Sequence, residues 1–149
     1  MERFSEQAAR LPMSEADPRH AAEAEALRTL ASALDDLAVG HPALERNAGV
    51  VRDRAERIQA SPANSLEHAD WTREALLTAV DALDLVARDT QGTPELAEQA
   101  RVARTAVEAI EPGVGMLRQR DATDRAFGEV AHGLDLSVRQ KPGPVLGTR

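Results

Sequence analysis

The feature that most constrains the fold of this chain is a series of helix start and stop signals along its length. Proline is tolerated in the first turn of a helix, where its missing N–H has no partner, and it takes that position at Pro18, Pro42 and Pro94. Glycine or a proline–glycine pair follows three of the helical segments, at Gly40, Gly92 and Pro112-Gly113. These signals predict five helices, over residues 18–39, 42–60, 65–91, 94–111 and 114–139.

The predicted helices also repeat one another. Glu25-Ala26-Leu27 recurs 49 positions later as Glu74-Ala75-Leu76. The helices that follow match at an offset of 52, with Pro42, Leu44 and Ile58 recurring as Pro94, Leu96 and Ile110. The fifth helix resembles the third at an offset of 51, so the order is A-B-A-B-A. The alternative is that two alanine-rich amphipathic helices align by chance.

This pattern predicts an all-α protein, an up-and-down bundle of about five helices built from an internally repeated helical hairpin. No segment alternates with a period of two over the length of a strand. Short loops favour antiparallel neighbours, and a short stack of helical hairpins is the competing architecture. We expect one bundle domain over residues 14–139, an N-terminal segment over 1–13 that is a short helix or disordered, and a flexible C-terminal tail over 140–149.

The third predicted helix carries two apolar rows on nearly opposite sides. One row has the spacing four, three, four and consists of Ala69, Arg73, Leu76, Val80, Leu83 and Ala87. The other has mostly small residues and consists of Trp71, Ala75, Thr78, Ala82 and Leu85. Since an ordinary surface helix has one apolar stripe, we expect this helix at the centre of the bundle.

The second row has counterparts in the first and fifth helices. They are Ala22, Ala26, Thr29 and Ala33 in the first, and Ala122, Ala126, Glu129, Gly133 and Leu136 in the fifth. Such rows either pack within one chain or form the face of a homodimer. We favour the dimer, because Trp71 would otherwise lie near the surface and tryptophan is enriched at interfaces. Leu, Ile, Val and Phe occur only 31 times against 28 alanines, so self-association would add burial to a thin core.

The charge and the apolar runs of the chain argue against two classes of partner, nucleic acids and membranes. The net charge is −7 and arginines alternate with acidic residues, whereas a duplex-binding protein needs a concentrated positive surface, so we expect no nucleic-acid partner. No apolar run approaches the roughly 20 residues that span a bilayer, and the first 13 residues lack a signal-peptide core, so we expect a cytoplasmic protein without a membrane partner. A weak amphipathic anchor at Phe4, Ala8 and Leu11 is an alternative that the acidic balance opposes.

Few residues carry chemistry. The chain has no cysteine, no hydrolase signature and no phosphate-binding glycine loop, so we expect no enzyme and no cofactor. Glu129 and His132 have the Glu-x-x-His spacing that places two metal ligands on one helix face, but a di-metal bundle needs a second such motif. A haem pocket is disfavoured because the chain has one Trp, two Phe and no Tyr.

One aspartate recurs in all three A helices, at Asp35, Asp84 and Asp135. An aspartate near the C-terminal end of a helix opposes the helix dipole unless it is paired. We expect it to pair with an arginine of an adjacent B helix, such as Arg52, Arg54, Arg101 or Arg104; a shared ligand role of the three aspartates is the alternative.

The leading hypothesis is a non-enzymatic helical protein–protein interaction or scaffold protein that self-associates and holds a protein partner. Its expected interaction face is the second row of the third helix, Trp71, Ala75, Thr78, Ala82 and Leu85. The alternative is a metal- or small-ligand-binding bundle that uses His132 and Glu129 with nearby carboxylates.

Overall fold

The structure is a computed structural model that describes residues 18–39, 41–61, 67–89, 94–114 and 116–140. Within these ranges it contains five α-helices, one short 3-10 helix and no strand. The elements are α2 (Pro18–Leu37), α3 (Pro42–Ala60), α4 (Glu67–Asp89), α5 (Pro94–Glu108), η1 (Met116–Gln119) and α6 (Arg120–Gln140). The predicted all-α bundle is confirmed, while the N-terminal segment over 1–13 and the tail beyond residue 140 lie outside the described residues.

Proline sets the beginning of three helices, as the sequence predicts. Helices α2, α3 and α5 each begin at a proline, and the extended backbone of His41 leads into α3. Ser61 follows α3, and its hydroxyl donates to the carbonyl oxygen of Ile58 at 2.7 Å, which satisfies one of the last free carbonyls of the helix. Helix α5 ends at Glu108, three residues before the predicted end.

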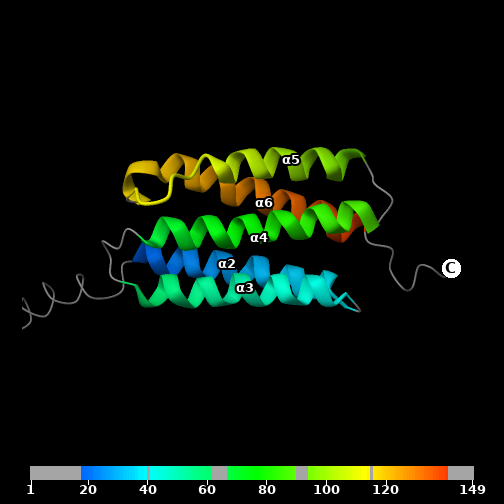
Figure 1. Cartoon of the computed structure of the whole chain (residues 1–149), viewed down its shortest axis with the longest axis horizontal. Coiled ribbons are helices and arrows are strands. Elements are labelled where there is room, and N and C mark those ends of the chain that lie inside the picture. Colours follow the sequence, from blue (N-terminus) through cyan, green and yellow to red (C-terminus); the bar gives the residue numbers. More distant parts are fainter. Residues whose placement is uncertain (1–17, 40, 62–66, 90–93, 115, 141–149) are drawn as a thin grey trace, which may run out of the picture.

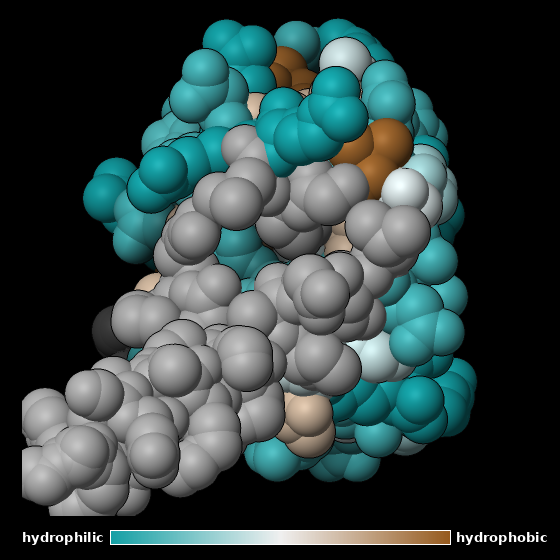
Figure 2. Space-filling model, turned by 90° about the vertical axis from the view of Figure 1, so that its left-hand side faces the viewer, coloured by the Kyte–Doolittle hydropathy of each residue, from teal (hydrophilic) through white to brown (hydrophobic). Residues whose placement is uncertain are grey.

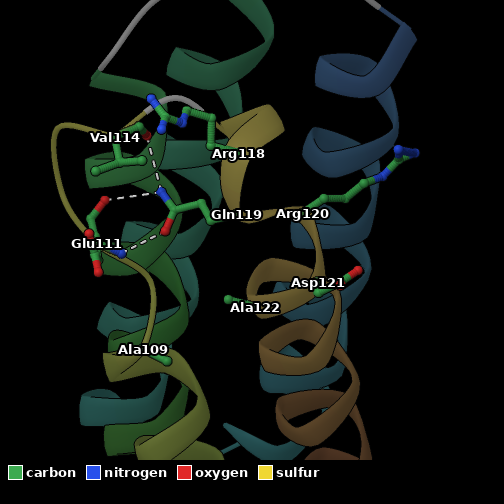
Figure 3. A pocket seen from close by; sticks show the side chains of 8 residues that line it. All are labelled: Ala109, Glu111, Val114, Arg118, Gln119, Arg120, Asp121 and Ala122. Carbon is green, nitrogen blue, oxygen red and sulfur yellow. Dashed lines mark hydrogen bonds between the residues drawn. The ribbon is translucent and has the colours of Figure 1, made fainter.

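The start of the last helix differs most from the prediction. α6 begins at Arg120 and not near Val114, because a turn and η1 come first. Gly113 has a φ of 78°, a backbone conformation that residues other than glycine rarely adopt. The side chain of Gln119 accepts from the N–H of Glu111 at 2.8 Å and donates to the carbonyl oxygens of Glu111 and Val114 (Figure 3). These bonds stabilise the turn, because they give backbone N–H and carbonyl groups the partners that a continuous helix would otherwise supply.

The five α-helices lie side by side and consecutive helices run in opposite directions (Figure 1). Helices α2, α4 and α6 therefore run in the same direction, and each of them contacts the other two. Helix α3 packs against α2 and α4, whereas α5 packs against α4 and α6. The three predicted A helices, α2, α4 and α6, thus form the centre of the bundle. The predicted B helices, α3 and α5, lie over two of the three junctions between them.

The expectation of a central third helix is confirmed, because α4 contacts each of the other four described α-helices. In its first predicted row, Leu76, Val80 and Leu83 are fully buried. In an open stack of hairpins the first and third A helices would not meet, so the contact between α2 and α6 supports a closed bundle. That one hairpin is repeated stays a prediction.

The two B helices bury apolar rows of the same spacing. In α3 the row is Leu44, Ala48, Val51, Ala55 and Ile58, and from α5 into the following turn it is Leu96, Ala100, Ala103, Val107 and Ile110. Alanine in these rows lets helix axes approach closely, and burying apolar surface contributes roughly 25 cal/mol per Å². Within the described ranges no helix is both long and apolar enough to cross a membrane.

Candidate functional site

The predicted interaction face on α4 is largely internal. Ala75 and Ala82 are fully buried within the single chain, so their side chains are not available to a partner. Trp71, Thr78 and Leu85 are half-buried, and only this part of the row reaches the surface. α3 packs along this side of α4, where Arg54 donates through Nε to Glu74 Oε1 at 2.7 Å. Packing within one chain therefore accounts for the two alanines.

The weak metal candidates do not form a site with other ligands. His132 is exposed, and the Glu129 carboxylate accepts from Gln99 Nε2 of α5 at 2.8 Å. Among the residues that the structure describes, no group of three or more His, Asp or Glu side chains could hold a metal ion. The spacing of Glu129 and His132 is therefore accounted for by an interhelical hydrogen bond and a surface histidine.

A buried histidine pair is the polar cluster that sequence reasoning missed. His20 of α2 and His68 of α4 are at most 4 % exposed, and their rings meet edge to face with centroids 4.1 Å apart. The Nε2 atom of His68 lies 2.6 Å from Oε1 of Glu23. Both histidines lie in the first turns of parallel helices, where the helical period does not reveal which side will be covered. This cluster fixes the start of α2 against the start of α4.

The recurring aspartates pair with arginines of the next helix, as predicted, in both A–B hairpins. Asp35 of α2 forms an ion pair with Arg52 of α3. Asp84 Oδ2 of α4 lies 2.6 Å from Arg104 Nη2 of α5, and Asp81 Oδ1 lies 2.9 Å from the same nitrogen. The hydrogen bonds to Asp81 and Asp84 raise the pKa of the Arg104 guanidinium. These pairs align each B helix with the A helix before it.

The third aspartate has a different partner. Asp135 of α6 pairs with Arg139 of its own helix, at 2.8 Å between Oδ2 and Nη2. In the part of the chain that the structure describes, no helix follows α6. Helix α3 covers the junction of α2 with α4, and α5 covers the junction of α4 with α6. The junction between α6 and α2 is the one that neither of them covers.

Two contacts fix how α6 is rotated. Glu129 bonds to α5, and Gly133 faces Leu83 of α4, since a Cβ atom added at Gly133 would lie 2.6 Å from Cδ1 of Leu83. At 100° per residue, the opposite flank of α6, on the side of α2, carries Phe127, Ala131 and Val138.

Helix α2 is oriented in the same way. Arg28 bonds to Gln59 of α3, and Glu23 bonds to His68 of α4. The flank that remains, on the side of α6, carries three alanines of the small-residue row predicted in this helix. We call the two flanks together the α2–α6 face, which consists of Ala22, Ala26, Ala33, Phe127, Ala131 and Val138.

The α2–α6 face is accessible, whereas the matching positions elsewhere are buried. Val138 is 50 % exposed and Ala131 is exposed. The positions 51 residues earlier on α4, Ala87 and Val80, are 6 % and 0 % exposed, on a helix that packs against both α5 and α6. Likewise Ala26 and Ala33 are half-buried, while the alanines 49 positions later, Ala75 and Ala82, are fully buried beneath α3. A helix packed over the α2–α6 face would lower the exposure of these residues to that of their counterparts on α4.

A depression of about 720 Å³ lies where α5 passes through the turn and η1 into α6. It is lined by Ala109, Glu111, Val114, Arg118, Gln119, Arg120, Asp121 and Ala122. The side chains of Arg118 and Arg120 point to different sides, and Gln119 is taken up by the turn (Figure 3). Their charges do not converge on one point, so this depression does not form an anion site.

The same end of the bundle is mostly hydrophilic outside the residues drawn in grey, with hydrophobic surface in small separate areas (Figure 2). A second depression, of about 480 Å³, adjoins the first at Ala109. Its charged lining residues, Glu98, Arg101, Arg125 and Glu129, mix both signs. Neither depression combines an apolar wall with converging polar groups, as a small-molecule site does.

Comparisons of this chain with protein-family models, with curated proteins and with solved structures give no match.

Proposed function

We propose that this chain is a non-enzymatic interaction protein that holds one α-helix of a protein partner on its α2–α6 face. The observation that carries the proposal is the accessibility of Ala131 and Val138, whose matching positions on α4 are buried within the bundle. Three parallel helices in mutual contact have three outer junctions, and two of these hold a helix already. A partner helix in the third would bury apolar surface in the same way as α3 and α5.

The chemistry of the partner follows from the two helices that fill the other junctions. Both present alanine, valine, leucine or isoleucine at spacings of four and three, and both place an arginine against an aspartate of the preceding A helix. On α6 the exposed acidic side chains of Asp124 and Asp135 lie beside the face. The expected partner segment is an amphipathic helix with arginine or lysine on one flank, antiparallel to α2 and α6.

A synthetic peptide of residues 42–60 tests this proposal, because it carries the apolar row and arginines of a helix that already fits such a junction. A fluorescently labelled peptide should bind the full chain, and Ala131→Glu or Val138→Glu should weaken binding at least tenfold, about 1.4 kcal/mol. Both positions are exposed, so the variants should stay folded. Val102→Glu on α5, at 37 % exposure, is the matched control and should leave binding unchanged.

A second copy of the chain is the other partner that this face would suit. Light scattering of the full chain should then give a mass above 16.0 kDa that returns to the monomer value in Val138→Glu. A monomer that binds the peptide assigns the face to a different protein. Failure of the peptide to bind, together with a monomer at micromolar concentration, would refute the proposed function.

A further inference from the structure

We propose that Asp135 of α6 and Glu25 of α2 select a partner helix with the sequence Arg-x-Arg, whose first arginine pairs with Asp135 and whose second pairs with Glu25. The inference rests on the proposed function, since it names the charges that the α2–α6 face recognises in its partner. Asp135 lies one helical turn from Ala131, and Glu25 lies one turn from Ala22, so the two carboxylates stand on the two flanks of this face.

The junction between α2 and α4 already holds such a sequence. Arg52 of α3 forms an ion pair with Asp35 of α2. Two residues further along α3, Nε of Arg54 lies 2.7 Å from Oε1 of Glu74 on α4, and this hydrogen bond raises the pKa of the Arg54 guanidinium. One Arg-x-Arg sequence therefore spans the junction from one A helix to the other.

The junction between α4 and α6 lacks the second carboxylate, and its B helix lacks the second arginine. The position on α6 that lies 51 residues after Glu74 is Arg125. Helix α5 has Ala106 at the position 52 residues after Arg54. Arg125 and Ala106 line the same depression between α5 and α6, so an arginine in place of Ala106 would meet a like charge. The arginines of each B helix thus match the charges of the two A helices beneath it.

The open junction has both carboxylates. Asp135 occupies the position of the recurring aspartate, and Glu25 lies 49 residues before Glu74. Each now pairs within its own helix, Asp135 with Arg139 at 2.8 Å and Glu25 with Arg28 at 3.3 Å. Exposed pairs of this kind contribute little to stability, so an arginine of a partner helix displaces them at a small cost.

The two B helices also fix where the arginines stand in the partner. In α3, Arg52 comes directly after Val51, the third residue of the buried row, and Arg104 comes directly after Ala103, the third residue of the row in α5. The expected partner therefore has apolar residues at positions 1, 5, 8, 12 and 15 of a helix, as α3 has, with arginines at positions 9 and 11.

Double-mutant cycles between the full chain and the labelled 42–60 peptide test this assignment, with fluorescence anisotropy as the measurement. Asp135→Asn and Glu25→Gln in the chain should each weaken binding of the unmodified peptide about threefold. Asp135→Asn should have no further effect on a peptide with Arg52→Gln, and Glu25→Gln should have none on a peptide with Arg54→Gln. In the two crossed combinations the losses should multiply.

A peptide of residues 94–112 is the matched control ligand. It keeps Arg104 at the position of the first arginine but has Ala106 at the position of the second. Its binding should therefore weaken with Asp135→Asn and stay unchanged with Glu25→Gln.

Glu98→Gln on α5 is the matched control for Glu25→Gln in the chain. Glu98 also pairs with an arginine three positions further along its own helix, Arg101, but it lies outside the α2–α6 face. This variant should leave the affinity for both peptides unchanged. The side chains of Asp135 and Glu25 are 54 % and 72 % exposed, so their amide variants should stay folded.

The outcomes separate this inference from the proposed function. Coupling in the two matched cycles, with independent losses in the crossed ones, supports the assignment of the two carboxylates. If the 42–60 peptide binds and Val138→Glu weakens it, but matched and crossed cycles do not differ, this inference is wrong while the proposed function stands. If the peptide does not bind the unmodified chain, both are wrong.

Discussion

Arg104 of α5 donates through Nη2 to Oδ2 of Asp84 on α4, at a distance of 2.6 Å. The ion pair of Arg52 with Asp35 joins α3 to α2 in the same way, one hairpin earlier. Both pairs link a B helix to the A helix before it, so they set how far each hairpin is shifted along its axis. Asp135, which no described B helix follows, turns instead to Arg139 of its own helix.

The pair of Asp84 and Arg104 should be coupled in stability. Its side chains are 43 % and 35 % exposed, and partly exposed ion pairs contribute little, so the expected coupling is about 0.5 kcal/mol. A double-mutant cycle with Asp84→Asn and Arg104→Met, followed by urea unfolding, measures it. The control cycle is Glu98→Gln with Arg101→Met, a more exposed pair within α5 that should show no coupling. Equal coupling in the two cycles would contradict the proposal that the Asp84–Arg104 pair aligns α5 with α4.

Glu23 should stabilise the fold through the buried His68. Glu23→Ala leaves Nε2 of His68, whose residue is 1 % exposed, without its carboxylate partner. A buried polar group that loses its partner costs about 1–3 kcal/mol, so the midpoint of urea unfolding should fall clearly. Glu25→Ala, two residues along the same helix and at an exposed position, should change the free energy of unfolding by less than about 0.5 kcal/mol. Similar losses in both variants would show that the contact adds nothing.

Gly133 should be required for the close approach of α6 to α4. A Cβ atom at this position would lie 2.6 Å from Cδ1 of Leu83, a fully buried side chain with little room to move. Overpacking costs about 1–3 kcal/mol, which outweighs the gain of about 1 kcal/mol from replacing glycine by alanine in a helix. Gly133→Ala should therefore destabilise the protein in thermal or urea unfolding.

Gly49→Ala is the matched control for that substitution. Gly49 lies in α3 and is exposed, and a Cβ atom added there would meet no heavy atom within 4 Å, so only the gain in helix propensity remains. The variant should be more stable by about 0.5–1 kcal/mol. A stabilising Gly133→Ala would mean that α4 and α6 are not closely packed at this point.

Much of the fold could be predicted from local signals. Prolines and glycines predict where helices begin and end because they act within one turn of the backbone, and Pro18, Pro42 and Pro94 are each the first residue of a helix. The delayed start of α6 could not be predicted in this way. It depends on Gln119 bonding back to Glu111 and Val114, and on Asp70 of α4 accepting from the N–H of Gly113 at 3.0 Å. Such contacts join residues that no helical period relates.

The candidate site was harder to predict than the fold. The period of α4 shows two apolar rows, but it does not tell whether α3 or a second chain covers Ala75 and Ala82. The same small-residue row on α2 was visible in the sequence at Ala26 and Ala33. Only the three-dimensional structure shows that no described helix covers this row. There α2 contacts α6, the last described helix, and neither α3 nor α5 lies over that junction.

The most direct test of the open junction is the reactivity of a single thiol in the Val138→Cys variant. This side chain is 50 % exposed on the α2–α6 face. The thiol should react rapidly with a maleimide in the free protein and at least tenfold more slowly with saturating 42–60 peptide, while Val102→Cys on α5 reacts at the same rate in both. If Val138→Cys stays equally reactive with the peptide bound, the α2–α6 face does not receive the helix and the central claim is wrong.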